Sequence, residues 1–196
     1  VMDVRCGGTG VQLSGRKLRA AQIVAMQTEG MGTFESAREF CKVMCTDPIL
    51  PDYPVYGSNN WYYAYGDSSE EEILQDTDYI VELTKGVDNP PYMVIDDCWQ
   101  EHHRLNEYNG GPWKKGNKKF PDMGALAKKL EEKGVRPGIW VRFLLNEEET
   151  IPQEWRLSHN DCLDPSHPDV LSYIQEDVER ICNWGYTLIK HDFTTF

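Results

Sequence analysis

Hydrophobic residues in the second part of the chain follow two alternating patterns. Short apolar runs rich in β-branched residues, typical of buried parallel strands, are followed by longer segments with apolar residues every three or four positions, as on one face of a helix. The four runs that we predict as strands span about residues 55–61, 92–95, 135–142 and 187–192. Strands that alternate with amphipathic helices predict parallel strands with right-handed crossovers, and therefore an α/β fold.

Each predicted helix between these strands has residues that favour its start and its end. A serine or aspartate at the start can accept a hydrogen bond from the first turn, and a glycine just past the end readily takes the left-handed backbone found there. The expected start and stop residues are Ser68 or Ser69 with Gly86, Asp122 with Gly134, and Pro168 with Gly185. The third helix is predicted to bury one side, formed by Leu171, Ile174, Val178 and Ile181.

The first 50 residues have a different pattern. Residues 11–13 and 18–27, separated by a turn-like Ser-Gly-Arg, predict a hairpin of two strands, and Thr33 is expected to cap a helix. Residues 47–54 contain three prolines, which cannot continue a helix and are typical of a linker. We therefore predict that residues 1–50 are the tail of a preceding β-rich domain, plus a helix and a connector.

Aromatic and charged residues stand at the ends of the predicted strands. No Gly-x-Gly-x-x-Gly loop follows the first strand, which removes the main argument for an open nucleotide-binding sheet. A closed barrel is favoured because strand ends converge there on one mouth, where active sites are built. Residues 51–196 are therefore predicted to form the first half of a (β/α)8 TIM barrel. The strand-end residues are Trp61, Asp96, Asp97, Trp140, Arg142, Lys190 and Asp192.

The composition narrows the range of functions. The 196 residues carry a formal net charge of −12, which argues against a nucleic-acid partner because phosphate binding needs a basic face. No apolar run reaches the length of a membrane span, so no membrane partner is expected. Six cysteines without Cys-x-x-Cys spacing fit free buried thiols better than a disulfide framework. The first and last residues suggest a piece of a longer chain, and the compartment and a possible homo-oligomer stay open.

Lys190 and Asp192 form the most informative pair in the sequence. Alternate side chains of a strand share a face, so these two are expected to point the same way while His191 points the other way. A neighbouring lysine keeps a carboxylate ionised, and an ionised carboxylate at a strand end can act as a nucleophile. The alternative is a salt bridge at the strand terminus.

Asp96 and Asp97 are consecutive, so an extended backbone would point them to opposite sides. Aromatic rings beside paired acids suit a sugar, because rings pack on its apolar face and carboxylates accept hydrogen bonds from its hydroxyls. Asp96 and Asp97 are therefore better suited to holding such hydroxyls than to acting as the two catalytic carboxyl groups of a glycosidase. The alternative is that they cap a helix or bridge to Arg142. His102 and His103 are adjacent and would not converge well on one metal ion. With no cofactor fingerprint either, neither a cofactor nor a metal is expected.

Four motifs occur in order, two of them at predicted strand ends: Tyr-Met-Val-Ile-Asp-Asp-Cys-Trp-Gln100, Gly-Val-Arg-Pro-Gly-Ile-Trp140, Leu-Asp-Pro-Ser-His-Pro-Asp-Val170 and Ile-Lys-His-Asp192. From about Pro54 onward, the chain resembles the α-galactosidase clan of retaining glycoside hydrolases. It is most similar to the melibiase-like family 36, and family 27 is related. The first 50 residues resemble the end of the β-sandwich domain that precedes the family 36 barrel.

The resemblance implies roles for four charged residues. Asp192, which matches the aspartate of the family's Lys-x-Asp motif, would be the nucleophile that attacks the anomeric carbon. Lys190 would bind sugar hydroxyls and keep Asp192 charged. Asp96 and Asp97 would hold the hydroxyls at the far edge of a galactose ring. The family's acid/base aspartate lies on a later strand, outside these residues.

The resemblance also implies that aromatic residues and one arginine line the subsite for the terminal sugar. Trp61 would form the wall of the subsite for the terminal sugar, Trp140 and Arg142 would share a face beside it, and Trp113 would add a rim. His191 departs from the tryptophan or tyrosine that is usual there, which leaves the exact substrate open. The expected function is removal of terminal α-linked galactose from an oligosaccharide or glycan. The alternatives are a clan enzyme for N-acetylgalactosamine or β-L-arabinopyranose, a galactosyl transferase, or a non-catalytic galactose-binding protein.

Overall fold

The computed structural model describes residues 14–15, 17, 22–157 and 161–193. The chain divides into two compact units, Val1–Leu50 and Pro51–Phe196, and each unit is considered by itself. No helix within the described residues combines the length and the apolar character that crossing a membrane requires.

The first unit contains one described helix, α1 (Thr33–Met44). Gly32 occupies its N-cap position, so Thr33 is the first helical residue rather than the cap that we predicted. No side chain of α1 is buried. The predicted hairpin is not formed by residues 22–27, which carry no strand, because an extended segment becomes a strand only when a neighbour pairs with its backbone. Its other residues, 11–13 and 18–21, lie outside the described part of the chain.

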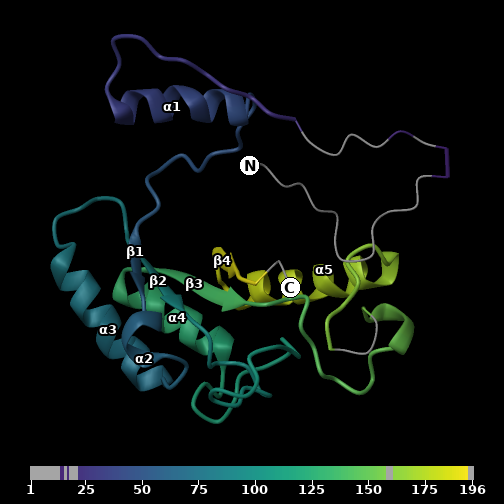
Figure 1. Ribbon diagram of the computed structural model, residues 1–196. Coiled ribbons are helices and arrows are strands. Elements are labelled where there is room, and N and C mark those ends of the chain that lie inside the picture. The colour runs from purple at the N-terminus through teal and green to yellow at the C-terminus, as the bar shows by residue number, and fades with distance from the viewer. Residues whose placement is uncertain (1–13, 16, 18–21, 158–160, 194–196) are drawn as a thin grey trace. The chain divides into compact units, whose positions relative to one another are not determined.

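The second unit is built on a sheet of four parallel strands in the order β1-β2-β3-β4. The strands are β1 (Gly57–Asn59), β2 (Tyr92–Ile95), β3 (Arg136–Val141) and β4 (Leu188–His191). The helices that link them are α2 (Trp61–Ala64) and α3 (Glu70–Leu83), then α4 (Met123–Lys133), then the 3-10 turn η1 (Gln153–Trp155) and α5 (Pro168–Trp184). The α/β fold predicted from the sequence is confirmed (Figure 1).

The register of the sheet brings the ends of the strands to one edge. Ile95 pairs with Ile139, and Trp140 pairs with Lys190. Because neighbouring strands follow one another in sequence, each crossover steps in the same direction across the sheet. The residues just past the strands therefore gather at the carboxyl edge, which is where parallel sheets bind their ligands.

The helix boundaries follow local hydrogen bonds. Ser69 Oγ accepts from the Glu72 N–H at the start of α3, and Asp122 Oδ1 accepts from the Ala125 N–H at the start of α4, as predicted. Gly134 and Gly185 take the left-handed backbone after α4 and α5. Helix α3 ends earlier than expected, at Leu83, because the Thr84 hydroxyl donates back to the Ile80 carbonyl.

Two predicted positions were wrong at the ends of elements. The first strand stops at Asn59, and Trp61 is the first residue of α2 rather than the last of the strand. Asn59 Oδ1 accepts from the Trp61 N–H at 2.9 Å, and this side-chain bond turns the backbone out of the sheet. Leu171 is 54% exposed because the buried face of α5 passes through Val170 instead.

The core of the unit is rich in aromatic rings. Trp99, Trp113 and Trp140 are fully buried and pack against one another, with ring centroids of successive partners 5.7 and 5.9 Å apart. Trp113 is therefore a core residue and not the rim that we predicted for the site. Trp184 is partly buried and packs edge-on against Trp99 at 6.0 Å. These packed rings form an aromatic cluster next to the ends of the strands.

Five cysteines of the described chain are free, and they are Cys41, Cys45, Cys98, Cys162 and Cys182. Only Cys98 and Cys162 are buried, so the prediction of buried thiols holds for two of the five. Burial raises the pKa of the Cys98 thiol to about 12, which keeps it protonated at neutral pH.

Candidate active site

The carboxyl edge of the sheet brings together Lys190, Asp96 and Asp192 from two different strands. Lys190 Nζ donates to Asp96 Oδ2 at 2.7 Å and lies 3.8 Å from Asp192 Oδ2. The ammonium group therefore connects the two carboxylates. The predicted shared face of Lys190 and Asp192 is present in the structure. His191 turns the other way and its ring lies 5.4 Å from that of Phe143.

Asp192 is held as an accessible carboxylate. Its side chain is 40% exposed, Oδ2 accepts from Trp140 Nε1 at 3.0 Å, and Oδ1 accepts from the Phe193 N–H at 2.9 Å. Burial alone would raise the pKa of Asp192, but these two hydrogen bonds, with Lys190 and Arg142, lower it below the usual value. An ionised carboxylate with solvent access is the chemical requirement for an attacking nucleophile.

Asp96 is buried and its oxygens are occupied by protein donors. Oδ2 accepts from Lys190 and from Asn59 Nδ2 at 2.5 Å, and Oδ1 accepts from the Asp97 N–H at 2.9 Å. The Asp96 N–H donates to Asn60 Oδ1 at 2.8 Å. Asparagines at the end of β1 therefore fix both the backbone and the side chain of Asp96.

Asp97 lies in a separate environment, as its adjacent position in the sequence predicted. It is 5% exposed, and Oδ1 accepts from Gln100 Nε2 at 3.0 Å. Burial raises the pKa of Asp97 to about 6, with a further rise from Asp96, while hydrogen bonds from Gln100 and Asn109 oppose the rise. The alternative of a direct bridge to Arg142 is not formed, and Arg142 Nη1 donates to Asn109 Oδ1 at 2.8 Å instead.

Trp61 and Asp97 line one pocket of about 280 Å³. Two tyrosines, Tyr65 and Tyr108, add rings to its wall, and Asn109 adds an amide. Aromatic walls around a small number of polar groups are typical of a site for a small molecule. Trp61, which stands on α2 rather than at a strand end, therefore shares a pocket with Asp97, whereas Asp96, Lys190 and Asp192 do not line that pocket.

Trp140 and Arg142 reach the site in different ways. The rings of Trp140 are buried at 1% exposure, and its indole N–H points at Asp192. Arg142 follows β3, and its guanidinium carbon lies 4.6 Å from the centre of the Phe193 ring, next to Asp192. The adjacent histidines diverge, as their spacing predicted: His102 Nδ1 is 3.1 Å from Glu147, and His103 Nε2 is 4.0 Å from Asp97.

Known proteins that resemble the chain are α-galactosidases. It is 26% identical to an α-galactosidase of Oryza sativa over 71% of this chain and 29% of the relative. It is 31% identical to the α-galactosidase Mel36A of Lactobacillus acidophilus over 59% of this chain and 14% of the relative. The chain is therefore similar in sequence to α-galactosidases. It spans less than a third of the length of these curated relatives. No protein-family model matches it.

Solved structures of α-galactosidases have a fold similar to that of this chain. The family 36 (GH36) α-galactosidase AgaA of Geobacillus stearothermophilus superimposes with a TM-score of 0.58 at 27% identity, over 72% of this chain and 21% of that one. A variant of AgaA in complex with raffinose gives a TM-score of 0.56 at 28% identity over the same shares. The solved structures that the chain resembles thus include family 36 α-galactosidases, the family that its sequence motifs resemble.

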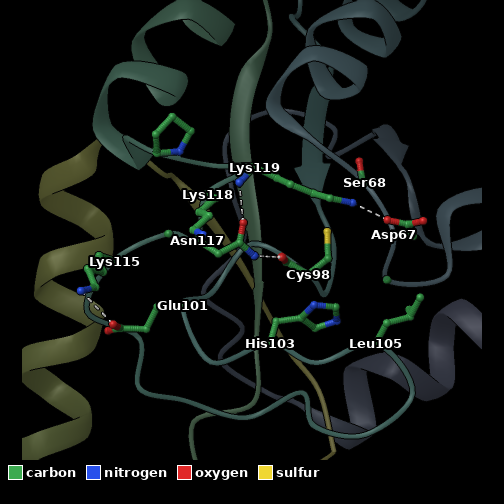
Figure 2. Close-up of a pocket in the computed structure, with 13 residues that line it drawn as sticks. Asp67, Ser68, Cys98, Glu101, His103, Leu105, Lys115, Asn117, Lys118 and Lys119 are labelled. Atoms are coloured by element: carbon green, nitrogen blue, oxygen red, sulfur yellow. Dashed lines mark hydrogen bonds and ion pairs between the residues drawn. The ribbon is translucent and has the colours of Figure 1, made fainter.

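A larger cavity of about 750 Å³ in the second unit contains none of the strand-end acids (Figure 2). Two of the lysines on its wall are paired with carboxylates, since Lys115 lies 3.0 Å from Glu101 and Lys119 pairs with Asp67. No aromatic ring other than His103 lines it. Its size therefore does not make it the sugar site, because it lacks both the acid pair and a stacking surface.

Three asparagines of the site were missed by the sequence reasoning. Asn59 and Asn60 hold Asp96, and Asn109 accepts from Arg142 and lines the same pocket as Asp97. The Asn-Asn pair near the end of the first predicted strand could have been recognised, because two consecutive polar residues there lie close to the edge where Asp96 and Asp97 follow the next strand. Asn109 lies within a long loop and had no such signal.

Proposed function

We propose that the protein containing this chain is a retaining glycosidase that removes terminal α-linked galactose by double displacement. The observation that carries the proposal is the single ammonium group of Lys190 between buried Asp96 and accessible Asp192. A lysine in that position binds vicinal hydroxyls and keeps the nearby carboxylate ionised. The relationship to α-galactosidases supports galactose as the sugar.

In the first step, an Asp192 oxygen attacks the anomeric carbon of the bound sugar. The bond from that carbon to the leaving oxygen breaks, the leaving oxygen takes a proton from a general acid, and a glycosyl ester forms on Asp192. We propose that this acid is a carboxyl group on a later strand, outside these 196 residues. In the second step, water loses a proton to the same group and attacks the carbon, which releases galactose and the Asp192 carboxylate.

The other side chains at the edge hold the sugar and the nucleophile. Asp97 and Lys190 bind hydroxyl groups of the sugar. Asp96 also belongs to the hydroxyl-binding residues and holds Lys190 in place, and Trp61 packs against the sugar ring. The indole N–H of Trp140 and the backbone N–H of Phe193 each hold one oxygen of Asp192, and these two bonds fix the orientation of the carboxylate toward the anomeric carbon. Arg142 adds positive charge beside the nucleophile.

We further propose that the four strands are the first half of a (β/α)8 barrel and that residues 1–50 are the end of a preceding β-rich domain with its connector. The strand order supports the barrel, since all crossovers step in one direction, whereas a doubly wound sheet reverses direction at a switch point. The gathering of charged residues at the carboxyl edge supports it as well.

The substrates we propose are oligosaccharides or glycans that end in α-linked galactose. The structure of an AgaA variant in complex with raffinose supports this class of ligand. The experiment that tests the function is ¹H NMR of the products of an aryl α-galactoside incubated with the full-length protein. Because two displacements each invert the anomeric carbon, the first sugar to appear is expected to be α-galactose.

Other outcomes of that experiment point elsewhere. Early release of β-galactose would show an inverting enzyme and contradict the role of Asp192. Activity only on aryl α-N-acetylgalactosaminide or β-L-arabinopyranoside would change the sugar while keeping the mechanism. Galactose binding without hydrolysis would favour a non-catalytic protein.

A further inference from the structure

Asn59 is the last residue of β1, and its amide group makes two hydrogen bonds at the carboxyl edge of the sheet. Its Oδ1 accepts from the Trp61 N–H at 2.9 Å, and its Nδ2 donates to Asp96 Oδ2 at 2.5 Å. Trp61 lines the sugar pocket, and Asp96 follows β2. Asn59 therefore joins two parts of the site that come from different elements.

The parallel register explains why Asn59 reaches Asp96. Asn59 pairs with Val94 of β2, and Asp96 lies two residues beyond Val94. Alternate residues of an extended segment point to the same face, so the amide and the carboxylate meet on the same side of the sheet. The two partners also fix how the amide is oriented, because a backbone N–H only donates and an ionised carboxylate only accepts.

The Asp96 carboxylate is held by three donors among the described residues. The Asp97 N–H donates to Oδ1 at 2.9 Å, while Asn59 and Lys190 share Oδ2 at 2.5 and 2.7 Å. A carboxylate oxygen accepts about two hydrogen bonds, so Asn59 and Lys190 together fill Oδ2 and each limits where the other can lie. A carboxylate fixed at both oxygens gives the Lys190 ammonium one defined position.

The position of this ammonium matters because Lys190 also faces the proposed nucleophile. Its Nζ lies 3.8 Å from Asp192 Oδ2, and its side chain is 38% exposed, so it can reach a sugar at the edge of the sheet. The interaction between two charges weakens as their separation grows. A displaced ammonium would therefore change both its effect on Asp192 and its contact with the sugar.

We propose that Asn59 is a positioning residue for the reaction: it holds Asp96 so that the Lys190 ammonium lies between Asp96 and Asp192. The inference rests on the proposed function, because it takes Lys190 as a ligand of the sugar and Asp192 as the nucleophile. Asn59 acts through Asp96 and Lys190, not through contact with the reacting atoms. A residue at the end of the first strand thereby sets the geometry at the end of the fourth.

Asn59→Ser in the full-length protein removes the donor to Asp96 without adding a charge. A serine hydroxyl at this position can still accept from the Trp61 N–H, as in an ST-turn, but its side chain is too short to reach Asp96. We expect kcat/KM for an aryl α-galactoside to fall about ten-fold, in line with the loss of a hydrogen bond to a charged group.

Lys190→Met provides the background that separates positioning from a structural role. Once Lys190 is absent, Asn59→Ser is expected to change kcat/KM by less than about two-fold, because the group that Asn59 positions is gone. A purely structural role of Asn59 would lower kcat/KM by the same factor with and without Lys190.

Asn59→Asp is a second variant, and it keeps the turn at Trp61. The aspartate accepts from the Trp61 N–H as the asparagine does, but it cannot donate to Asp96 and it offers the ammonium another carboxylate. Lys190 is expected to move away from Asp192, and kcat/KM is expected to fall about ten-fold or more.

Asn89→Ser is the matched control. Asn89 also joins two partners, since its Nδ2 donates to the Pro54 carbonyl at 2.8 Å and its Oδ1 accepts from Arg136 Nη1 at 2.7 Å. It precedes β2, at the end of that strand opposite to Asp96. The same loss of an amide there is expected to leave kcat/KM unchanged.

The experiment is steady-state kinetics of these proteins, with circular dichroism to show that each is folded. Losses in both Asn59 variants, with the loss in Asn59→Ser absent from the Lys190→Met background, support the proposal. Unchanged kcat/KM in both Asn59 variants, or an Asn59→Ser loss that is as large without Lys190 as with it, would overturn it. If the unchanged protein hydrolyses no aryl α-galactoside, the proposed function fails and this inference fails with it, before any variant is compared.

Discussion

Asp192→Asn in the full-length protein is expected to reduce kcat for an aryl α-galactoside by about 10⁴-fold or more. The amide has nearly the shape of the carboxylate and can still accept from the Trp140 indole at Oδ, so the site should keep its geometry. It has no negative charge with which to attack the anomeric carbon, and no glycosyl ester can form. Galactose affinity is therefore expected to change by less than about ten-fold, because the hydroxyl-binding groups remain. Steady-state kinetics and calorimetric galactose binding measure the two quantities.

Asp169→Asn is the control for this variant. Asp169 lies in the first turn of α5 with its side chain 66% exposed, so the same change there should leave kcat nearly unaltered. An Asp192→Asn protein that kept more than about a tenth of the original kcat would identify another residue as the nucleophile.

Lys190→Met is expected to lower both stability and activity. Asp96 is 2% exposed and would lose its cationic partner, and removal of one partner from a buried pair costs about 3–5 kcal/mol. We expect about 3 kcal/mol, the low end, because Asn59 and the Asp97 N–H still donate to Asp96. Loss of a positive charge that holds the sugar and the nucleophile should reduce kcat/KM by about 10³-fold. Urea unfolding and steady-state kinetics measure the two effects.

Two further variants separate charge burial from catalysis. The double variant Lys190→Met with Asp96→Asn no longer has a buried unpaired carboxylate, so stability should largely return while activity stays low. Lys133→Met removes a lysine that pairs with Asp78 on the surface, and this should cost less than about 1 kcal/mol. Equal stability losses in Lys190→Met and Lys133→Met would show that the Lys190 pair is an ordinary surface salt bridge.

The regular elements of the second unit could be predicted because their signals are local. The apolar run 92–95 has the same bounds as β2. The helix caps at Ser69, Asp122 and Gly185 lie where a hydrogen-bonding side chain or a glycine favours a helix end. Trp61 was misplaced because a polar side chain, that of Asn59, captured its backbone N–H. Side-chain hydrogen bonds of this kind compete with the backbone hydrogen bonds of the sheet. Which of them forms depends on tertiary neighbours, and the apolar pattern of the sequence does not encode these.

The candidate site was predictable where its residues occupy strand ends. Alternation along a strand put Lys190 and Asp192 on one face, and the parallel register brought Asp96 next to them. The long loop after β2 was not predictable, since contacts such as that of Asn109 with Arg142 join positions with no fixed spacing. Trp113 was assigned to the surface for the same reason, although the loop folds it into the core.

The most direct test of the account is to trap the glycosyl intermediate on the full-length protein. A 5-fluoro-α-galactosyl fluoride has a leaving group that needs no proton, and its ring fluorine slows hydrolysis of the ester because it disfavours positive charge at the anomeric carbon. We expect mass spectrometry of the digested protein to find one galactosyl adduct, on the peptide that contains Asp192. An adduct on a different carboxylate, or continued turnover with no adduct at all, would contradict the role of Asp192 as the nucleophile.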